Sequence, residues 1–431
     1  MSGKRPQVVV AQLGARMHYA VPVLLHRAGL LAHFFTDAYA GAGSAWRRWQ
    51  SVAALVPPPA QPKVLQRLLG RRHDGLPAAR LTACNWLGLR FGLALCRAGD
   101  LPARRRIWQR YADEFCRLVV RDGSFQGDAI YASPGLAVPL FEHGARQGMF
   151  NILEGFGLPE IIQDRLHREE QARWPGWEPP LPPPDGCSRR RAAEAREWAL
   201  ADVIFAPSPF AIQGLMDAGA PPEKIRLVPY GLELPRFMVA RQARRDRRPL
   251  RVLFAGGVTL LKGPQYLLAA LELLHSSQVT ARMVGPVAIQ EPYRSRLRRR
   301  VELVGPVPRA DMPRHYAWAD VLVFPTICDS FGQVQVEAMA AGLPVIATPH
   351  AGQVVRDRLD GFLVPGRDPA AIAARIAILA RERDLWDWMS HQARERARHF
   401  SLESYGARLI GGICDRFEEQ RSRPASGATL A

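Results

Sequence analysis

Short apolar runs alternate with longer amphipathic stretches along the first half of the chain. The runs have the length and the β-branched and aromatic content of buried strands. They lie at residues 7–13, 33–39, 128–133, 149–154 and 202–208. Segments with helical spacing of apolar residues separate them. This alternation predicts a parallel sheet covered by helices.

The second half of the chain restarts the same alternation. A strand is expected at 250–257, a helix at 263–277, and further strands at 280–286, 301–307, 320–326 and 343–349. Asp368 and Pro369 form a favourable N-cap and first-turn pair for a helix that ends near residue 381. Two doubly wound, Rossmann-like α/β domains are therefore expected, followed by a helical segment at 400–420.

The basic run at residues 241–251 stands just before the strand that opens the second alternation. We interpret it as the interdomain linker region, although a solvated charge run would look the same. The expected divisions are a domain at 1–240, a second domain at 241–399, and a C-terminal helix with a polar tail at 400–431.

Two segments depart from the alternation. Residues 81–99 are apolar except for Arg90 and could form either a core helix or an interfacial membrane helix. Residues 174–186 contain too many prolines for a helix or a central strand. We expect this second segment to be a rigid surface loop, either a plain connector or a lid.

Composition adds a charge argument. The chain has 431 residues, 48% of them hydrophobic, which suits two folded domains and excludes general disorder. Its formal net charge is +18. Such a charge indicates an anionic partner, which could be nucleic acid, an anionic membrane face or a phosphorylated substrate. A generally Arg-rich proteome would give the same excess.

The six cysteines include no C-x-x-C pair, so no zinc site is expected, and they are too sparse in a chain of this length for a disulfide framework. The apolar stretch near the N-terminus is short and is interpreted as a strand and not as a signal peptide. No run of about 20 uncharged apolar residues is present, so we expect no transmembrane helix. A cytoplasmic protein is the expectation.

One glycine-rich loop is suited to a phosphate. The strand at 250–257 ends at Gly256 and Gly257, and Lys262 with Gly263 opens a helix. Glycines allow close backbone approach, and a helix N-terminus offers free N–H groups. The spacing is neither a nucleoside-triphosphate P-loop nor a dinucleotide fingerprint. A plain strand–helix turn with a solvated lysine is the alternative.

A second loop follows the strand at 320–326. Asp329 lies at the carboxyl end of that strand, where open α/β sheets bind ligands. Glu337 follows about a turn and a half into the next helix, from where a carboxylate can accept hydrogen bonds from a ribose diol. The alternative is that Asp329 caps the helix and Glu337 is a surface residue. Both loops together fit a nucleoside diphosphate that carries a polyhydroxylated group.

These motifs resemble those of the group 1 glycosyltransferases, which are retaining enzymes of the GT-B fold. The E-x7-E motif of that family is present as Asp329-x7-Glu337, and its G-x5-K-G loop as Gly256 through Lys262 and Gly263. Supporting matches lie at 197–210, 225–237, 301–326 and 360–368, so that the resemblance covers roughly 197–400. It implies two domains that face a cleft, with the C-terminal helix crossing back to the first.

The resemblance also implies an activity. The first domain would bind the acceptor and the second a nucleotide sugar. The enzyme would transfer a hexose, with retention, to a glycan or lipid-linked acceptor in cell-surface polysaccharide or glycolipid synthesis. No D-x-D pattern serves the diphosphate, so we expect no metal and no other cofactor. The basic charge fits docking on the inner face of the plasma membrane.

The expected site residues follow from these motifs. The catalytic candidates are Asp329, which would orient the sugar, Lys262, which would stabilise the departing diphosphate, and Glu154, a nucleophile candidate at the end of a strand. The expected substrate contacts are Gly14, His18, Gly256, Gly257, Lys262, Phe331, Gly332, Gln333, Val334 and Glu337. Double displacement and front-face attack are both compatible with this set.

The chain departs from the family pattern at three places. Asp329 replaces the usual Glu, Gly257 stands where Arg is frequent, and Gly14 is all that remains of a glycine pair. Asp329 and Gly257 leave open the alternative of a catalytically weak GT-B relative that binds a nucleotide sugar as a non-catalytic subunit, and the reduction to Gly14 concerns the acceptor side. A nucleic-acid-binding protein is a third hypothesis, but the basic runs belong to no recognisable module.

Overall fold

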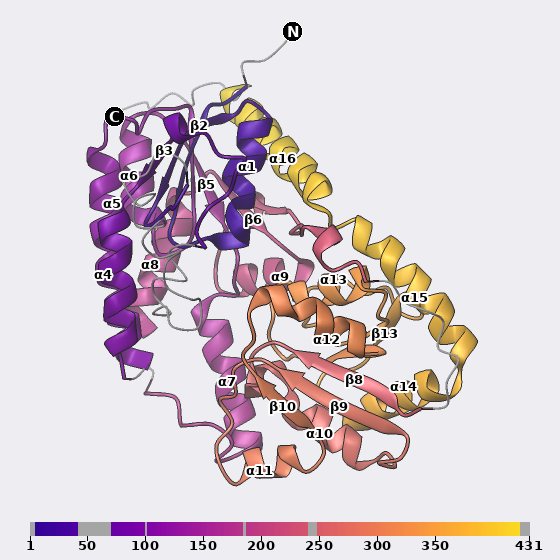
Figure 1. Cartoon of the computed structure of the whole chain (residues 1–431). Helices are drawn as coiled ribbons and strands as arrows, with labels where there is room; N and C mark the ends of the chain where they lie inside the picture. Colours follow the sequence, from indigo (N-terminus) through magenta and orange to yellow (C-terminus); the bar gives the residue numbers. More distant parts are fainter. Residues whose placement is uncertain (1–4, 42–69, 100, 184–186, 240–247, 423–431) are drawn as a thin grey trace, which may run out of the picture.

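The computed structural model describes residues 5–41, 70–99, 101–183, 187–239 and 248–422. Within these residues the chain forms two parallel sheets of seven and six strands, each covered by helices (Figure 1). The strand orders are β3-β2-β1-β4-β5-β6-β7 and β10-β9-β8-β11-β12-β13. Each order reverses beside its first strand, as in doubly wound folds. We call the two sheets with their helices the N-terminal and the C-terminal domain.

The strands of the N-terminal domain are β1 (Val8–Gln12), β2 (Leu31–Thr36), β3 (Leu81–Ala83), β4 (Ala129–Ala132), β5 (Phe150–Glu154), β6 (Val203–Ala206) and β7 (Ile225–Leu227). Those of the C-terminal domain are β8 (Leu250–Ala255), β9 (Val279–Val284), β10 (Glu302–Gly305), β11 (Val321–Phe324), β12 (Val345–Ala347) and β13 (Gly361–Leu363).

The helices in the first half are α1 (Ala20–Arg27), α4 (Asn85–Arg97), α5 (Leu101–Arg121), α6 (Ala137–Arg146), α7 (Glu160–Arg173), α8 (Cys187–Leu200) and α9 (Pro209–Asp217). Those in the second half are α10 (Pro264–Glu272), α11 (Tyr293–Arg298), α12 (Met312–Trp318), α13 (Gln333–Ala340), α14 (Pro369–Arg381), α15 (Arg383–Arg398) and α16 (Leu402–Ser422). A short 3-10 turn, η7 (Leu260–Lys262), precedes α10.

The structure confirms the predicted α/β fold and the expected strands, and it adds three that the sequence pattern did not indicate. These are β3, β7 and β13, each three residues long. The helix expected within residues 81–99 is present but shorter than the apolar stretch. Leu81–Ala83 pair in parallel with β2, and only Asn85–Arg97 are helical. A three-residue strand is too short to show a period of two against a helical pattern.

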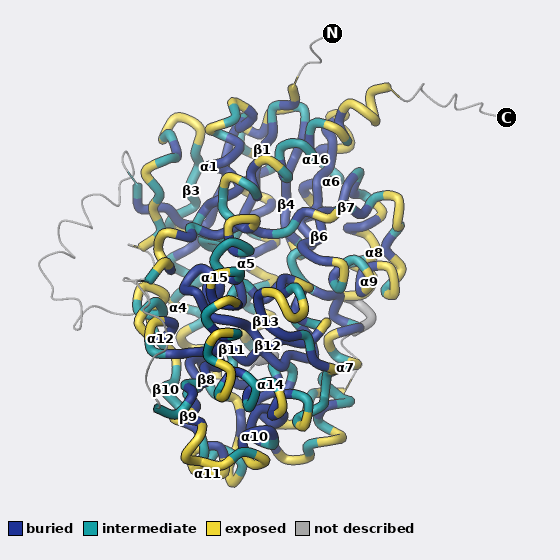
Figure 2. The backbone as a smooth tube through the Cα atoms, turned by 90° about the vertical axis from the view of Figure 1, so that its right-hand side faces the viewer, coloured by how far each residue is buried: buried dark blue, intermediate teal, exposed yellow. Residues whose placement is uncertain are grey.

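The apolar core runs between the domains as well as within them (Figure 2). One cluster joins Val10 and Tyr19 of the N-terminal domain to Phe331 and Met339 of the C-terminal domain through Tyr230. The Tyr230 and Phe331 rings meet edge to face with centroids 5.5 Å apart. The two domains are therefore joined by buried apolar contact.

The C-terminal helix crosses back to the N-terminal domain, as the resemblance implied. Figure 1 shows α15 beside the C-terminal domain and α16 continuing along the N-terminal one. Phe417 of α16 packs on Phe150 with centroids 5.9 Å apart, and Gln420 donates to Asp202 at 3.1 Å. The predicted domain boundary at residue 240 lies outside the described residues, and so does the part of the predicted polar tail beyond residue 422, where α16 ends.

The Pro-rich segment is not a simple surface loop over the residues that the structure describes, 174–183. The Trp177 side chain is only 2% exposed and belongs to the core of the C-terminal domain. Glu178 is also buried. Prolines at 175 and 179 leave the backbone on either side of this pair exposed, which is why the composition alone indicated a surface position.

In the described ranges, no helix combines the length and the apolarity that crossing a bilayer requires.

Glu197 of α8 provides a prediction about the pH dependence of stability. Its carboxylate accepts a hydrogen bond from the Gly135 N–H at 2.5 Å, and burial raises the pKa of Glu197 from 4.5 to about 7. Because the folded pKa exceeds the unfolded one, this stabilising contribution is present below pH 4.5 and is lost as pH rises through about 7. Glu197→Gln stays neutral and should gain up to about 3 kcal/mol relative to the native chain at high pH.

Urea unfolding of both proteins between pH about 5 and about 8 measures this difference. Parallel stability profiles for the native chain and Glu197→Gln would contradict the assignment.

Candidate active site

The glycine-rich loop lies at the carboxyl end of β8 and packs directly on the end of β11. Gly256 and Gly263 have φ values of 127° and 78°, which other residues rarely adopt. A Cβ added to Gly263 would lie 2.1 Å from the Pro325 carbonyl oxygen. Only glycine permits this close approach. The approach places the loop after β8 against the segment that leads to Asp329.

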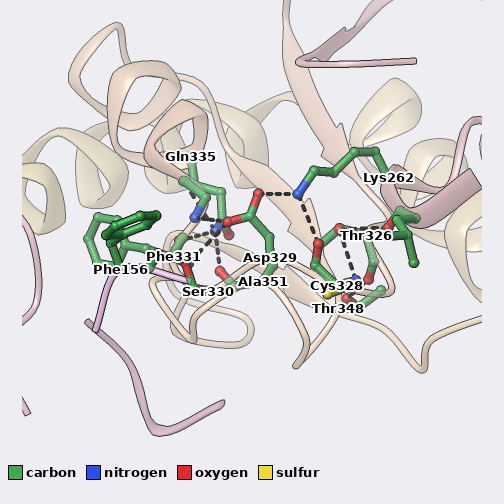
Figure 3. Close-up of polar contacts among 12 residues, drawn as sticks. Phe156, Lys262, Thr326, Cys328, Asp329, Ser330, Phe331, Gln335, Thr348 and Ala351 are labelled. Carbon is green, nitrogen blue, oxygen red and sulfur yellow. Dashed lines mark hydrogen bonds and ion pairs between the residues drawn. The ribbon is translucent and has the colours of Figure 1, made fainter. Parts of the chain in front are cut away.

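Lys262 and Asp329 meet at this junction (Figure 3). The Lys262 Nζ donates to Asp329 Oδ2 at 2.6 Å and to the Cys328 carbonyl oxygen at 2.8 Å. Both side chains are about a quarter exposed. The two motifs that sequence spacing selected, 67 residues apart, therefore form one cluster at the carboxyl edge of the second sheet.

The Asp329 loop closes on itself before α13 begins. Asp329 Oδ1 accepts hydrogen bonds from the N–H groups of Phe331 at 3.0 Å and Gly332 at 2.7 Å. These two N–H groups, expected to face the ligand, are thus engaged by the Asp329 carboxylate. The N–H groups of Gln333 and Val334, in the first turn of α13, have no acceptor among the described residues. They are the donors that the helix start offers to an anion.

Glu337 is buried in the second turn of α13. Its carboxylate accepts hydrogen bonds from the Tyr316 hydroxyl at 2.7 Å and from Arg309 at 3.3 Å. Burial raises the pKa of Glu337 despite these two donors. The side chain is 6% exposed, so the surface alternative considered above is excluded. Each oxygen keeps capacity for a further donor, because a carboxylate has about four acceptor sites.

The N-terminal domain reaches the same loop through the end of β5. Ser330 donates its hydroxyl to the Phe156 carbonyl oxygen at 2.7 Å (Figure 3). Two residues earlier, the buried Glu154 accepts hydrogen bonds from Arg16 at 3.2 and 3.3 Å. The Arg16 guanidinium also lies 3.6 Å from the centre of the Phe156 ring. Glu154 is therefore an ion-paired carboxylate at the domain interface.

Gly14 and His18 lie on the turn after β1. The Gly14 N–H donates to Asp37 at 2.7 Å, and Asp37 in turn pairs with Arg71. His18 has a left-handed backbone (φ 55°), flanked by two further residues with positive φ. It lines a cavity of about 510 Å³ whose other polar lining includes His73, Glu233 and Arg236. Burial lowers the pKa of His18.

The structure adds residues that the sequence did not single out. Arg16 and Ser330 lie one or two positions from predicted residues, whereas Arg309 and Tyr316 come from a separate segment that α13 packs against. For Arg16 and Ser330, adjacency to Gly14 and Asp329 was an available signal. Arg309 and Tyr316 carry no motif and are found only through their contacts with Glu337.

The overall architecture matches solved GT-B structures. Sucrose-phosphate synthase from Thermosynechococcus elongatus superposes with a TM-score of 0.65 at 18% identity, over 96% of this chain and 99% of that one. HepE of Anabaena, solved with UDP and with UDP-glucose, superposes with a TM-score of about 0.6 at 14–15% identity, over 95% of this chain and at least 99% of that one. The chain therefore has the GT-B fold of glycosyltransferases.

The family likeness is stronger in the second half. Residues 249–382 match the family described as "Glycosyl transferases group 1". The chain thus carries a group 1 glycosyl transferase domain, and the predicted resemblance is confirmed. D-inositol 3-phosphate glycosyltransferase of Xylanimonas cellulosilytica is 33% identical over 53% of this chain and 60% of that protein. The corresponding protein of Acidothermus cellulolyticus is 34% identical over 54% and 58%. The matched region spans little more than half of these relatives.

Gly263 provides a test of the loop geometry. Gly263→Ala should destabilise the chain by at least about 3 kcal/mol, because the methyl group meets Pro325 and the backbone is left-handed. Gly29→Ala is the matched control. Its φ is 73° but nothing lies within 4 Å of the added Cβ, so it should cost only about 1 kcal/mol. Equal losses in thermal or urea unfolding would show that the Pro325 approach is relaxed in solution.

Proposed function

We propose that the chain is a retaining glycosyltransferase that moves a sugar from a nucleoside-diphosphate sugar to a glycan or lipid-linked acceptor. The observation that carries this proposal is the convergence of Lys262, Asp329 and the α13 N-terminus at one sheet edge, opposite the N-terminal domain. Neighbours of the same fold were solved with UDP and UDP-glucose, and relatives are named as glycosyltransferases.

The chemistry follows from where charge develops. When the sugar leaves, negative charge builds on the diphosphate. The Lys262 ammonium and the N–H groups of Gln333 and Val334 come from the two loops that the Lys262–Asp329 pair joins, and together they would stabilise this charge. Because these donors are already fixed by the fold, they need little reorganisation during the reaction. Asp329 would keep Lys262 in position and accept a sugar hydroxyl, and Glu337 would hold the ribose.

The choice between two retaining routes concerns Glu154. A double displacement needs a carboxylate on the far face of the sugar. Glu154 comes from the opposite domain but is paired with Arg16 at 3.2 Å, and that pairing makes a carboxylate a weaker nucleophile. This contact favours front-face departure and attack, with Arg16 as a second cation near the donor. Independence from metals is part of the same proposal, because Lys262 takes the place that a divalent cation would otherwise fill.

Nucleotide binding is tested by thermal unfolding with a panel of nucleoside diphosphates and nucleotide sugars. A ligand at a hundredfold excess over its Kd adds about 2.7 kcal/mol to the stability of the native chain. Lys262→Ala and Glu337→Ala should lose this gain. Lys224→Ala is the matched control, because Lys224 is the other lysine of the described residues and lies on the N-terminal domain, with its Nζ on the Ala199 carbonyl. It should keep the gain.

A gain in stability with the nucleotides of one base, absent in Lys262→Ala and Glu337→Ala, would identify the donor class. No gain with any nucleotide in folded protein would overturn the proposal. A gain accompanied by no transfer or donor hydrolysis would favour the alternative of a non-catalytic subunit.

A lipid-linked acceptor would require contact with a membrane surface, and α4 offers one. Leu93 on α4 is exposed, and the exposed arginines 104–106 lie at the start of the neighbouring α5, while Trp86, which is 70% exposed, lies at the other end of α4. Apolar insertion combined with attraction of about 1 kcal/mol per basic residue is sufficient for peripheral binding to anionic lipid. We propose that this face docks on an anionic membrane.

Sedimentation with phosphatidylserine-containing vesicles tests the membrane proposal. Trp86→Ser should weaken binding at least about fivefold, and high salt should abolish it. Trp388→Ser, which removes an exposed tryptophan from α15 of the other domain, should leave binding unchanged. Absence of binding at low salt, or equal losses in the two variants, would contradict this assignment.

A further inference from the structure

One segment of the N-terminal half is built into the C-terminal domain. It comprises α7 and the Pro-rich loop to residue 183, and we call residues 160–183 the strap. Its start is fixed to the N-terminal domain, because the Glu160 N–H donates to Glu194 and the Glu160 carboxylate pairs with Arg190. Figures 1 and 2 both place α7 beside the C-terminal domain. The strap therefore spans the two domains independently of the linker and of α16.

The far end of the strap is anchored by aromatic residues and by a buried carboxylate. Trp177 stacks on Tyr293 with ring centroids 5.0 Å apart. Glu170 has no exposed surface and accepts hydrogen bonds from Gln265, Tyr266 and Arg367 at 2.6–2.9 Å. A buried charge with three donors is well satisfied and tolerates few alternative arrangements. This anchor fixes the strap against α10.

The strap also controls the backbone of the phosphate loop. Glu178 Oε1 accepts the Leu260 N–H at 2.7 Å, at the first residue of η7, where no side chain of the turn itself provides a cap. The Leu260 carbonyl accepts from Gln265 Nε2, which also donates to Glu170. Both polar backbone groups of Leu260 are thus held, directly or through Gln265, by carboxylates of the strap. Lys262 is the last residue of the same turn.

We propose that Glu178 is a positioning residue for Lys262 and that the strap sets the phosphate loop from the N-terminal half of the chain. This inference rests on the proposed function, in which Lys262 binds the donor diphosphate. His167 supports the assignment, because its Nε2 lies 2.6 Å from the second Glu178 oxygen and fixes the carboxylate plane. Without Glu178 the N–H of the buried Leu260 loses its acceptor, and the turn is free to rearrange.

Hydrogen exchange of the backbone amides tests the contact without any ligand. In Glu178→Ala the amides of Leu260–Lys262 should exchange at least about tenfold faster than in the native chain. Glu178→Gln keeps an acceptor oxygen and should stay near the native rate. Glu169→Ala is the matched control, since it removes a neighbouring strap carboxylate that pairs with Arg367 and does not reach the loop. If the alanine variant does not fold, Glu178→Asp, which ends one methylene short, takes its place.

Turnover of the nucleotide sugar identified by the thermal panel is the second readout. Glu178→Ala should lower kcat/KM at least about tenfold per folded molecule, and Glu178→Gln should restore most of it. Unchanged loop exchange in Glu178→Ala, or an equal change in Glu169→Ala, would overturn the proposal. If the native chain binds no nucleotide, the proposed function fails, while the exchange experiment still decides the role of the strap.

Discussion

The position of one ammonium group, that of Lys262, is the constraint on which the site depends. Its ion pair with Asp329 is a quarter exposed, and such pairs contribute only about 1 kcal/mol or less to stability. The surrounding structure is far more costly. It requires a left-handed glycine pressed against Pro325 and a buried turn whose N–H is capped by Glu178 from another segment. These surrounding contacts, and not the ion pair alone, set the position of the Lys262 ammonium.

The two domains are coupled around this group by several independent contacts. Ser330 bonds to Phe156, Tyr230 packs on Phe331, and the strap carries Glu178 to the phosphate loop. Each contact joins residues far apart in sequence. A displacement of the N-terminal domain would therefore change the geometry of the Lys262 and Asp329 loops. In the proposed reaction this coupling would link donor positioning to the approach of the two domains.

Much of the fold was predictable, because long apolar strands and helix spacing are local signals. The strands near 250–257 and 320–326 were located from their apolar runs. The loops that follow them were located from the spacing of their glycine, lysine and acidic residues. Short strands such as Leu81–Ala83 were missed, because three residues show no reliable period. Arg309 and Tyr316 could not be found, because their relation to Glu337 exists only in three dimensions. Trp177 was misjudged because its proline neighbours dominate the local composition.

The replacement of the family's first Glu by Asp329 has a structural explanation. The short Asp329 side chain accepts hydrogen bonds from the N–H groups two and three residues further along the chain. Asp favours this turn geometry, and a longer Glu does not reproduce it as readily. The second oxygen still meets Lys262 at 2.6 Å. The replacement therefore keeps a carboxylate at the site and tightens the loop that presents Gln333 and Val334. Asp329 is therefore a weak argument for the non-catalytic alternative. Gly257 remains as a departure, and Arg16 is a cation of the opposite domain that packs on Phe156, whose carbonyl accepts the Ser330 hydroxyl of the Asp329 loop.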